Sequence, residues 1–132
     1  MTVARRRADV VLVRYAAVGA VATAGHWLLL AALVEGPAAP PWLASGAGAL
    51  FGAQLAFYGN RRFTFGHRGA PWPAWWRFMA TAALGGVVGM AIVGAGVASG
   101  LHYLLAQAGA TAANLLLTFA VNRRWTFNAP PR

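Results

Sequence analysis

The sequence predicts an all-α, polytopic membrane four-helix bundle built from two parallel-repeat helical hairpins, with both termini on the cytoplasmic side. Three observations predict it. First, 59% of the 132 residues are hydrophobic and only 10% are charged, whereas a soluble domain carries about 25% charged residues. Second, the apolar residues form four long stretches, and every arginine lies outside them. Third, one hexapeptide pattern occurs twice, which indicates a duplicated unit.

The four apolar stretches are long enough to cross a membrane as helices. A bilayer core about 30 Å thick needs roughly 20 apolar residues of helix, and the candidates cover residues 15–34, 42–58, 78–98 and 102–121. Helical structure is expected throughout each, because in lipid every backbone polar group needs an internal partner. Prolines end the first stretch, a Gly- and Pro-rich segment separates the second from the third, and Ser99-Gly100 predicts a tight turn before the fourth.

The positions of the arginines predict the orientation of these spans. Four arginines precede the first span, four lie between the second and the third, and three follow the fourth, whereas the other two connections contain none. Because short loops rich in Lys and Arg stay in the cytoplasm, both termini and the middle loop are expected there. The predicted location is therefore the inner (cytoplasmic) membrane, which the chain crosses several times.

Composition also excludes several classes of function. Cysteine and lysine are absent, so thiol chemistry, Schiff-base chemistry and a Walker A ATP site are excluded. Asp9 and Glu35 are the only acidic residues, which argues against paired-carboxylate catalysis. His26, His67 and His102 lack the spacing of metal ligands. We therefore expect no enzyme, no cofactor and no metal site, and the apolar spans argue against nucleic acid as the partner of the basic residues.

The internal repeat covers most of the chain. The hexapeptide that begins at Asn60 (Asn-Arg-Arg-Phe-Thr-Phe) returns at Asn122 as Asn-Arg-Arg-Trp-Thr-Phe, and Arg14-Tyr15, which opens the first span, returns at the third as Arg77-Phe78. We call the separation between equivalent residues of the two repeats, such as Asn60 and Asn122 or Arg14 and Arg77, the repeat spacing. These two separations differ by a single position. Residues 1–132 therefore read as one transmembrane domain with a hairpin repeat at 14–65 and another at 77–127. Each repeat has two spans, so both repeats share one orientation.

Small residues at four-residue spacing predict close helix packing. Gly48 and Gly52 form such a pair in the second span, and Gly85 and Gly89 form one in the third. Such pairs let helix backbones approach closely where lipid supplies no hydrophobic drive. They predict a compact bundle and carry no functional information.

The repeated hexapeptide has a structural and a functional interpretation, which are compatible. Asparagine suits a left-handed helix C-cap, arginine complements the helix dipole and reaches the interface, and aromatic residues anchor at headgroup depth. Alternatively, the arginines form a paired phosphate site, because guanidinium groups bind phosphate oxygens bidentately. The candidate phosphate-binding residues are Arg61, Arg62, Arg123 and Arg124, with Asn60 and Asn122 in support.

Polar residues inside the spans are a second candidate site. Four residues of the fourth span and the residue that follows it lie within an arc of about 80° at helical spacing: Gln107, Thr111, Asn114, Thr118 and Asn122. They serve either as interhelical hydrogen-bonding groups or as a hydrophilic track for a polar headgroup. His26 lies at mid-membrane depth in the first span, where an ionisable residue is a functional candidate, and Gln54 is a similar isolated polar group. The aromatic segment 69–77 is expected to set depth at the membrane interface.

These residues resemble the GtrA-like family of small membrane proteins. Arg14-Tyr15, Val18-Gly19, Thr23 and His26-Trp27 resemble the family's opening, and the segments 60–65 and 122–127 resemble its Asn-x-(Lys/Arg)-aromatic-Thr-Phe signature. The resemblance implies a role in cell-envelope polysaccharide synthesis or O-antigen modification. The implied activity is the flipping of a polyprenyl-phosphate-linked monosaccharide, with lipid phosphate held by Arg62 and Arg124, supported by Asn60 and Asn122. The implied partners are that lipid and a membrane glycosyltransferase.

Two other functions remain as alternatives to flipping. The protein could instead be a non-transporting scaffold that anchors a polyprenyl-phosphate glycosyltransferase. A small multidrug-type exporter has similar size, but it uses a membrane-embedded Glu in the first span, whereas Glu35 lies at the end of that span here. Four helices enclose little volume for a sugar, which raises the alternative of a homo-oligomer.

Overall fold

The protein consists of four long helices. The structure, a computed structural model, describes the backbone of residues 3–66, 69 and 71–126, and the side chains of these residues up to Leu117. The helices are α1 (Val3–Glu35), α2 (Pro41–Gly59), α3 (Trp72–Ala98) and α4 (Tyr103–Thr126), and a short π-helix, η1 (Asn60–Thr64), continues α2. The predicted all-α, four-helix architecture is confirmed, and the described residues contain no strand.

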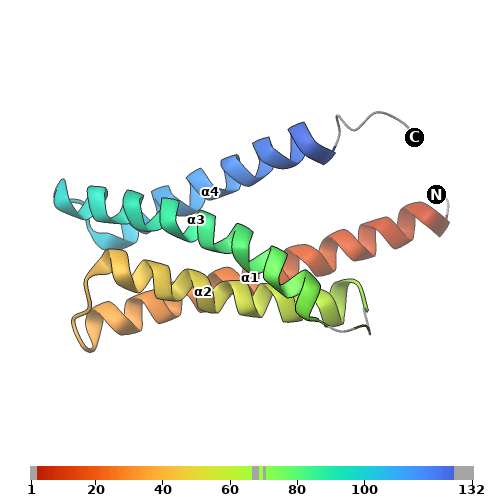
Figure 1. The fold of residues 1–132 in the computed structure, drawn as a ribbon, viewed down its shortest axis with the longest axis horizontal. Helices are drawn as coiled ribbons and strands as arrows, with labels where there is room; N and C mark the ends of the chain where they lie inside the picture. Colours follow the sequence, from red (N-terminus) through yellow and green to blue (C-terminus); the bar gives the residue numbers. More distant parts are fainter. Residues whose placement is uncertain (1–2, 67–68, 70, 127–132) are drawn as a thin grey trace.

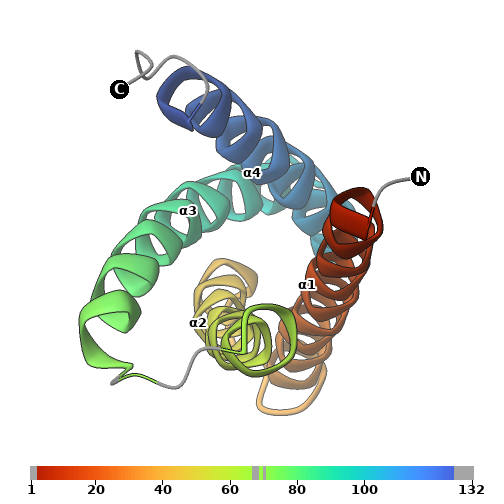
Figure 2. The same ribbon diagram turned by 90° about the vertical axis from the view of Figure 1, so that its right-hand side faces the viewer.

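The helices form two hairpins that lie side by side (Figure 1). The α1–α2 and α3–α4 connections lie at one end, and the start of α1, the α2–α3 connection and the end of α4 lie at the other. Because the arginine clusters of the sequence belong to these latter segments, we call this the arginine-rich end. Viewed from that end, α2 lies between α1 and α3, and α4 lies across from α2 (Figure 2). The main helix pairs are α1–α2, α2–α3 and α3–α4.

Two helices begin earlier than the apolar stretches predicted. Helix α1 starts at Val3 rather than at residue 15, because Ala and Arg favour helix and nothing before Tyr15 breaks it. Helix α3 starts at Trp72, with proline in its first turn, where the missing N–H costs no hydrogen bond. The predicted tight turn before α4 is present. Gly100 has φ 92°, and the Leu101 N–H donates to the Gly96 carbonyl at 3.0 Å, which is a Schellman ending.

The helix surfaces fit a lipid environment. By length and hydropathy, α1 and α3 are able to cross a membrane, and α4 adds a shorter apolar stretch, Tyr103–Leu117. Helix α2 has 19 residues and is therefore about 28 Å long, close to the thickness of a bilayer core. Leu28, Leu84 and Leu116 are 71%, 64% and 70% exposed. Large apolar side chains displayed in this way are suited to contact with lipid chains rather than with water.

The buried core lies toward the end opposite the arginines and repeats between the hairpins. Leu30 and Val93 are both fully buried, and they are separated by the same number of positions as Arg14 and Arg77. Ala44 and Ala106, also at the repeat spacing, are buried with them in two corresponding clusters. At the same end, the Tyr103 hydroxyl donates to a Glu35 carboxylate oxygen at 2.7 Å. Equivalent positions of the two hairpins therefore make equivalent packing contacts.

Of the predicted small-residue pairs, Gly48 and Gly52 lie where α1 and α2 approach closely. A Cβ on Gly48 would lie 2.7 Å from the His26 carbonyl oxygen, and one on Gly52 would lie 2.9 Å from the Ala22 carbonyl oxygen. In the second hairpin, Gly85 and Gly89 of α3 instead face Asn114 of α4. At the repeat spacing, His26 corresponds to Gly89 and Gly52 to Asn114. The polar residue and its glycine partner have thus exchanged helices between the two hairpins.

Candidate functional site

The first copy of the hexapeptide forms a π-helical turn. Asn60 has φ −66° and ψ −40°, so the prediction of a left-handed cap at this residue is wrong, and Gly66 (φ 56°) takes the positive φ instead. The Phe65 N–H donates to the Asn60 carbonyl at 2.9 Å, and the Thr64 hydroxyl donates to Asn60 Oδ1 at 2.8 Å. The Asn and Thr of the motif are therefore explained by a side-chain bond that closes this wide turn.

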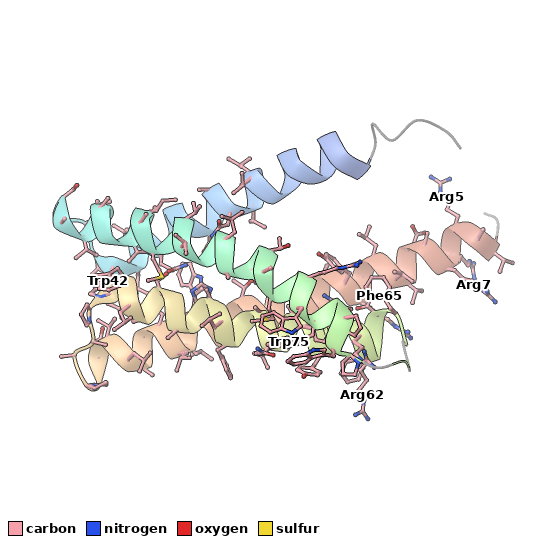
Figure 3. The ribbon with its side chains drawn as sticks, in the orientation of Figure 1. Arg5, Arg7, Trp42, Arg62, Phe65 and Trp75 are labelled. Carbon is pink, nitrogen blue, oxygen red and sulfur yellow. The ribbon has the colours of Figure 1, made fainter. Side chains whose placement is uncertain are left out.

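This turn directs its two arginines to different sites. Arg62 lines a groove between α1 and α2, whereas Asn60 and Arg61 line a second pocket between α1, η1 and α3. Arg62 extends away from the bundle at the same end as Arg5 and Arg7 (Figure 3). The three predicted phosphate-binding residues whose side chains the structure describes, Asn60, Arg61 and Arg62, are therefore divided between two cavities.

The α1–α2 groove is apolar with two arginines. It has a volume of about 600 Å³ and is lined by Arg14, Ala17, Val18, Val21, Gln54, Leu55, Tyr58, Gly59, Arg62 and Phe63. Arg14 Nη1 donates to the Phe63 carbonyl at 3.4 Å, and the Arg62 guanidinium lies 5.8 Å from the centre of the Phe63 ring. Arg14 and Arg62 thus both contact Phe63. Sequence reasoning had not assigned Arg14 to the site, although Arg77 is its counterpart in the second repeat.

Residues 122–126 of the second hexapeptide copy form the end of α4. The side chains of Thr118, Asn122, Arg123 and Arg124 lie outside the described part of the structure. Their assignment to the polar track and to phosphate binding therefore stays a prediction.

Part of the predicted polar track is occupied by interhelical hydrogen bonds. Gln107 is 1% exposed and Ser45 is 2% exposed, and the Ser45 hydroxyl donates to Gln107 Oε1 at 2.7 Å. Thr111 Oγ1 accepts from Gln107 Nε2 at 3.3 Å and from Trp27 Nε1 at 3.4 Å. Ser45 was not predicted, but it precedes Gln107 by the repeat spacing, so this bond joins equivalent positions of the two hairpins.

The next polar groups toward the arginine-rich end are less satisfied. Asn114 Nδ2 donates to the Gly85 carbonyl at 3.2 Å. The buried atoms Asn114 Oδ1 and His26 Nε2 have no hydrogen-bond partner among the described residues. Because an unpaired buried polar atom is costly, these two atoms are candidates for contact with a polar ligand.

The tryptophan-rich start of α3 is attached to α2. Trp75 Nε1 donates to Gln54 Oε1 at 3.0 Å, and Gln54 Nε2 lies 3.6 Å from Met79 Sδ. Trp72 stacks on Trp75 with ring centroids 5.3 Å apart. Figure 3 shows Trp75 beside α2. The segment predicted to set interfacial depth therefore also packs against the groove wall through Gln54, which sequence reasoning had treated as isolated.

The fold and these sites define a small four-helix membrane domain with an amphipathic, arginine-bearing groove at one end. A family model described as GtrA/DPMS, transmembrane domain, matches residues 14–129. This match covers most of the chain, and the protein belongs to that family. No curated protein and no solved structure matches this chain. Membership of the family connects the chain with the processing of lipid-linked sugars.

Proposed function

We propose that the protein moves a polyprenyl-phosphate-linked monosaccharide from one leaflet of the membrane to the other. The observation that carries this proposal is the α1–α2 groove, which joins two arginines to a long apolar wall. A polyprenyl phosphate has the same division, with an anionic phosphate at one end and a branched hydrocarbon chain at the other. The groove therefore fits the lipid carrier better than it fits a soluble nucleotide sugar, which has no apolar tail to bury.

The electrostatics of the groove favour an anion from outside the protein. The chain carries eleven arginines and only two acidic side chains. Of these two, Glu35 lies at the far end of α1 and accepts a hydrogen bond from Tyr103. A phosphate between Arg14 and Arg62 would gain charge-assisted hydrogen bonds, which are roughly twice as strong as neutral ones. Arg14 and Arg62 are the proposed phosphate-binding residues, and Arg124 with Arg77 is the corresponding pair by sequence repeat.

The interior polar groups support a route for the sugar. Asn114 Oδ1 offers an acceptor, and His26 Nε2 offers an acceptor or a donor. Beyond them lies the Ser45–Gln107–Thr111 network, whose groups are already paired. A sugar that advances along α4 would have to replace these bonds one by one. Exchange of one hydrogen bond for another costs far less than exposing a hydroxyl to lipid.

In the cell, this function places the protein in the inner membrane with its arginine-rich end in the cytoplasm. It would act between a membrane glycosyltransferase that makes the lipid-linked sugar and a second enzyme that uses it for cell-envelope polysaccharide or O-antigen modification. The protein itself performs no covalent step, so net movement is driven by supply on one side and consumption on the other.

The test is headgroup translocation of a polyprenyl-phosphate monosaccharide in vesicles that contain only this protein. Wild-type protein is expected to accelerate movement over empty vesicles. The variant Arg14→Gln/Arg62→Gln should lose at least about 10- to 100-fold, because the loss of even one charged hydrogen bond to the phosphate costs about 1.5–3 kcal/mol. The control, Arg5→Gln/Arg7→Gln, removes the same charge from exposed positions of α1 that do not line the groove, and it should retain wild-type rates.

Two outcomes would contradict parts of the proposal. Equal rates for the groove variant and its control would remove the phosphate role of Arg14 and Arg62. No movement by wild-type protein with several sugars would instead favour the alternative function, a scaffold that anchors a polyprenyl-phosphate glycosyltransferase. That alternative predicts that such an enzyme co-purifies with the chain.

A further inference from the structure

A second pocket lies on the other side of η1 and is walled by aromatic rings. We call it the aromatic pocket; it is lined by Tyr15, Phe57, Asn60, Arg61, Phe65, Ala74 and Phe78. Its volume is about 380 Å³, within the range of small-molecule sites. It shares η1 with the α1–α2 groove, since adjacent residues Arg61 and Arg62 line the two sites separately.

The pocket lies where the two hairpins meet at the arginine-rich end. Tyr15 of α1 and Phe78 of α3 occupy equivalent positions of the two repeats, and both line it. Phe57 is buried and supports Phe78, with ring centroids 5.5 Å apart. Tyr15 and Phe65 remain 53% and 64% exposed. Aromatic residues that only set membrane depth have no need to converge from three elements on one cavity.

The side chains of the pocket match the chemistry of a sugar ring. A monosaccharide has apolar C–H faces, which pack against aromatic rings, and a rim of hydroxyl groups, which need donors and acceptors. Asn60 and Arg61 supply an amide and a guanidinium beside the rings. Both are held in place, because Asn60 Oδ1 accepts from Thr64 and Arg61 Nη2 donates to the Gly69 carbonyl. A purely hydrocarbon ligand would leave these polar groups unused.

We infer that the aromatic pocket binds the monosaccharide headgroup of the same lipid whose phosphate lies at Arg14 and Arg62. This inference rests on the proposed function and adds a sugar-recognition site to it. The two sites then read the two parts of one ligand on either side of η1. The carrier's phosphate and tail supply affinity in the α1–α2 groove, and the sugar supplies specificity in the aromatic pocket.

The experiment compares two ligands, polyprenyl phosphate and polyprenyl-phosphate mannose, in binding to the purified protein in nanodiscs. The measured quantity is the ratio of their dissociation constants. Wild-type protein is expected to bind the glycosylated lipid more tightly. Tyr15→Leu/Phe65→Leu should reduce this sugar preference by about five- to tenfold, since ring contacts of this kind are modest individually, without weakening the binding of bare polyprenyl phosphate.

Phe63→Leu is the matched comparison. Phe63 is 61% exposed, close to the 64% of Phe65, and belongs to the same turn, but it lines the α1–α2 groove. It should change the binding of both lipids equally and leave the ratio intact. Phe65→Leu alone is a milder variant if the double substitution perturbs folding, which far-UV circular dichroism would reveal.

The outcomes separate this inference from the proposed function. An unchanged ratio in Phe65→Leu and in the double variant, or a wild-type ratio of one with mannose, glucose and arabinose headgroups alike, overturns the sugar site. Wild-type binding of both lipids by Arg14→Gln/Arg62→Gln overturns the phosphate site instead. Loss of the ratio in the aromatic variants together with loss of all lipid binding in the arginine variant supports both.

Discussion

The closest approach of α1 and α2 gives a sharp prediction about stability. In Gly48→Ala the new Cβ would lie 2.5 Å from His26 Cδ2 and 2.7 Å from the His26 carbonyl oxygen. Carbon atoms prefer separations of about 3.5–4.0 Å, so the first contact is too short by about 1 Å. The imidazole can rotate, but the carbonyl oxygen belongs to the backbone of α1. The two helices must therefore move apart, and overpacking of this kind costs about 1–3 kcal/mol.

Reversible unfolding by SDS in mixed micelles, followed by far-UV circular dichroism, measures this cost. Gly19→Ala is the matched control, because a Cβ there meets nothing within 4 Å, and alanine favours helix by about 0.5–1 kcal/mol over glycine. Gly85→Ala is a second control, since its Cβ would lie 3.6 Å from Asn114 Oδ1, an ordinary contact. Equal stability of Gly48→Ala and Gly19→Ala would contradict the close packing of α1 on α2.

Two further predictions concern buried polar contacts. Ser45→Ala leaves Gln107 Oε1 without its 2.7 Å donor and should cost about 1–3 kcal/mol of stability. The double variant Ser45→Ala/Gln107→Leu should recover much of that loss. Additive costs of the two substitutions in the same SDS titration would contradict the pairing. Gln54→Leu removes the acceptor of Trp75 Nε1, so the Trp75 indole N–H resonance should move upfield in NMR spectra. The protein should also lose about 0.6 kcal/mol of stability. An unmoved resonance would show that the bond is absent.

The sequence predicted the helices well where their ends carry strong signals. The second span, expected at residues 42–58, corresponds to Pro41–Gly59, because proline marks its start. The beginnings of α1 and α3 were missed. Arg5, Arg7 and Trp72 lie in helix but interrupt no backbone hydrogen bond and lie outside the apolar stretches. Hydropathy reports where lipid contact is expected, and helices extend beyond that region when their residues permit.

The site was predicted less completely, for a physical reason. The repeated hexapeptide identified Asn60, Arg61 and Arg62 as candidates, but not that a π-helical turn directs the two arginines to different cavities. Hydrogen bonds between i and i+5 leave no distinct residue pattern, since Asn and Thr suit several endings. Comparison of equivalent repeat positions would have found Ser45 from Gln107, because the two are separated by the repeat spacing. The same comparison paired Arg14 with Arg77, but neither was a predicted site residue, so it could not identify Arg14.

The direction of the repeat has a consequence for the proposed transport. Two hairpins with the same orientation bring both hexapeptide copies to one end of the bundle (Figure 1), whereas an inverted repeat would offer an equivalent site at each face. The opposite end carries buried apolar clusters and the Glu35–Tyr103 bond, and its connections contain no arginine. If the proposed function holds, a lipid phosphate would be captured at one face and would find no matching cations at the other. On this proposal, binding would select the substrate where it is made, and no second phosphate site would hinder its release on the far side.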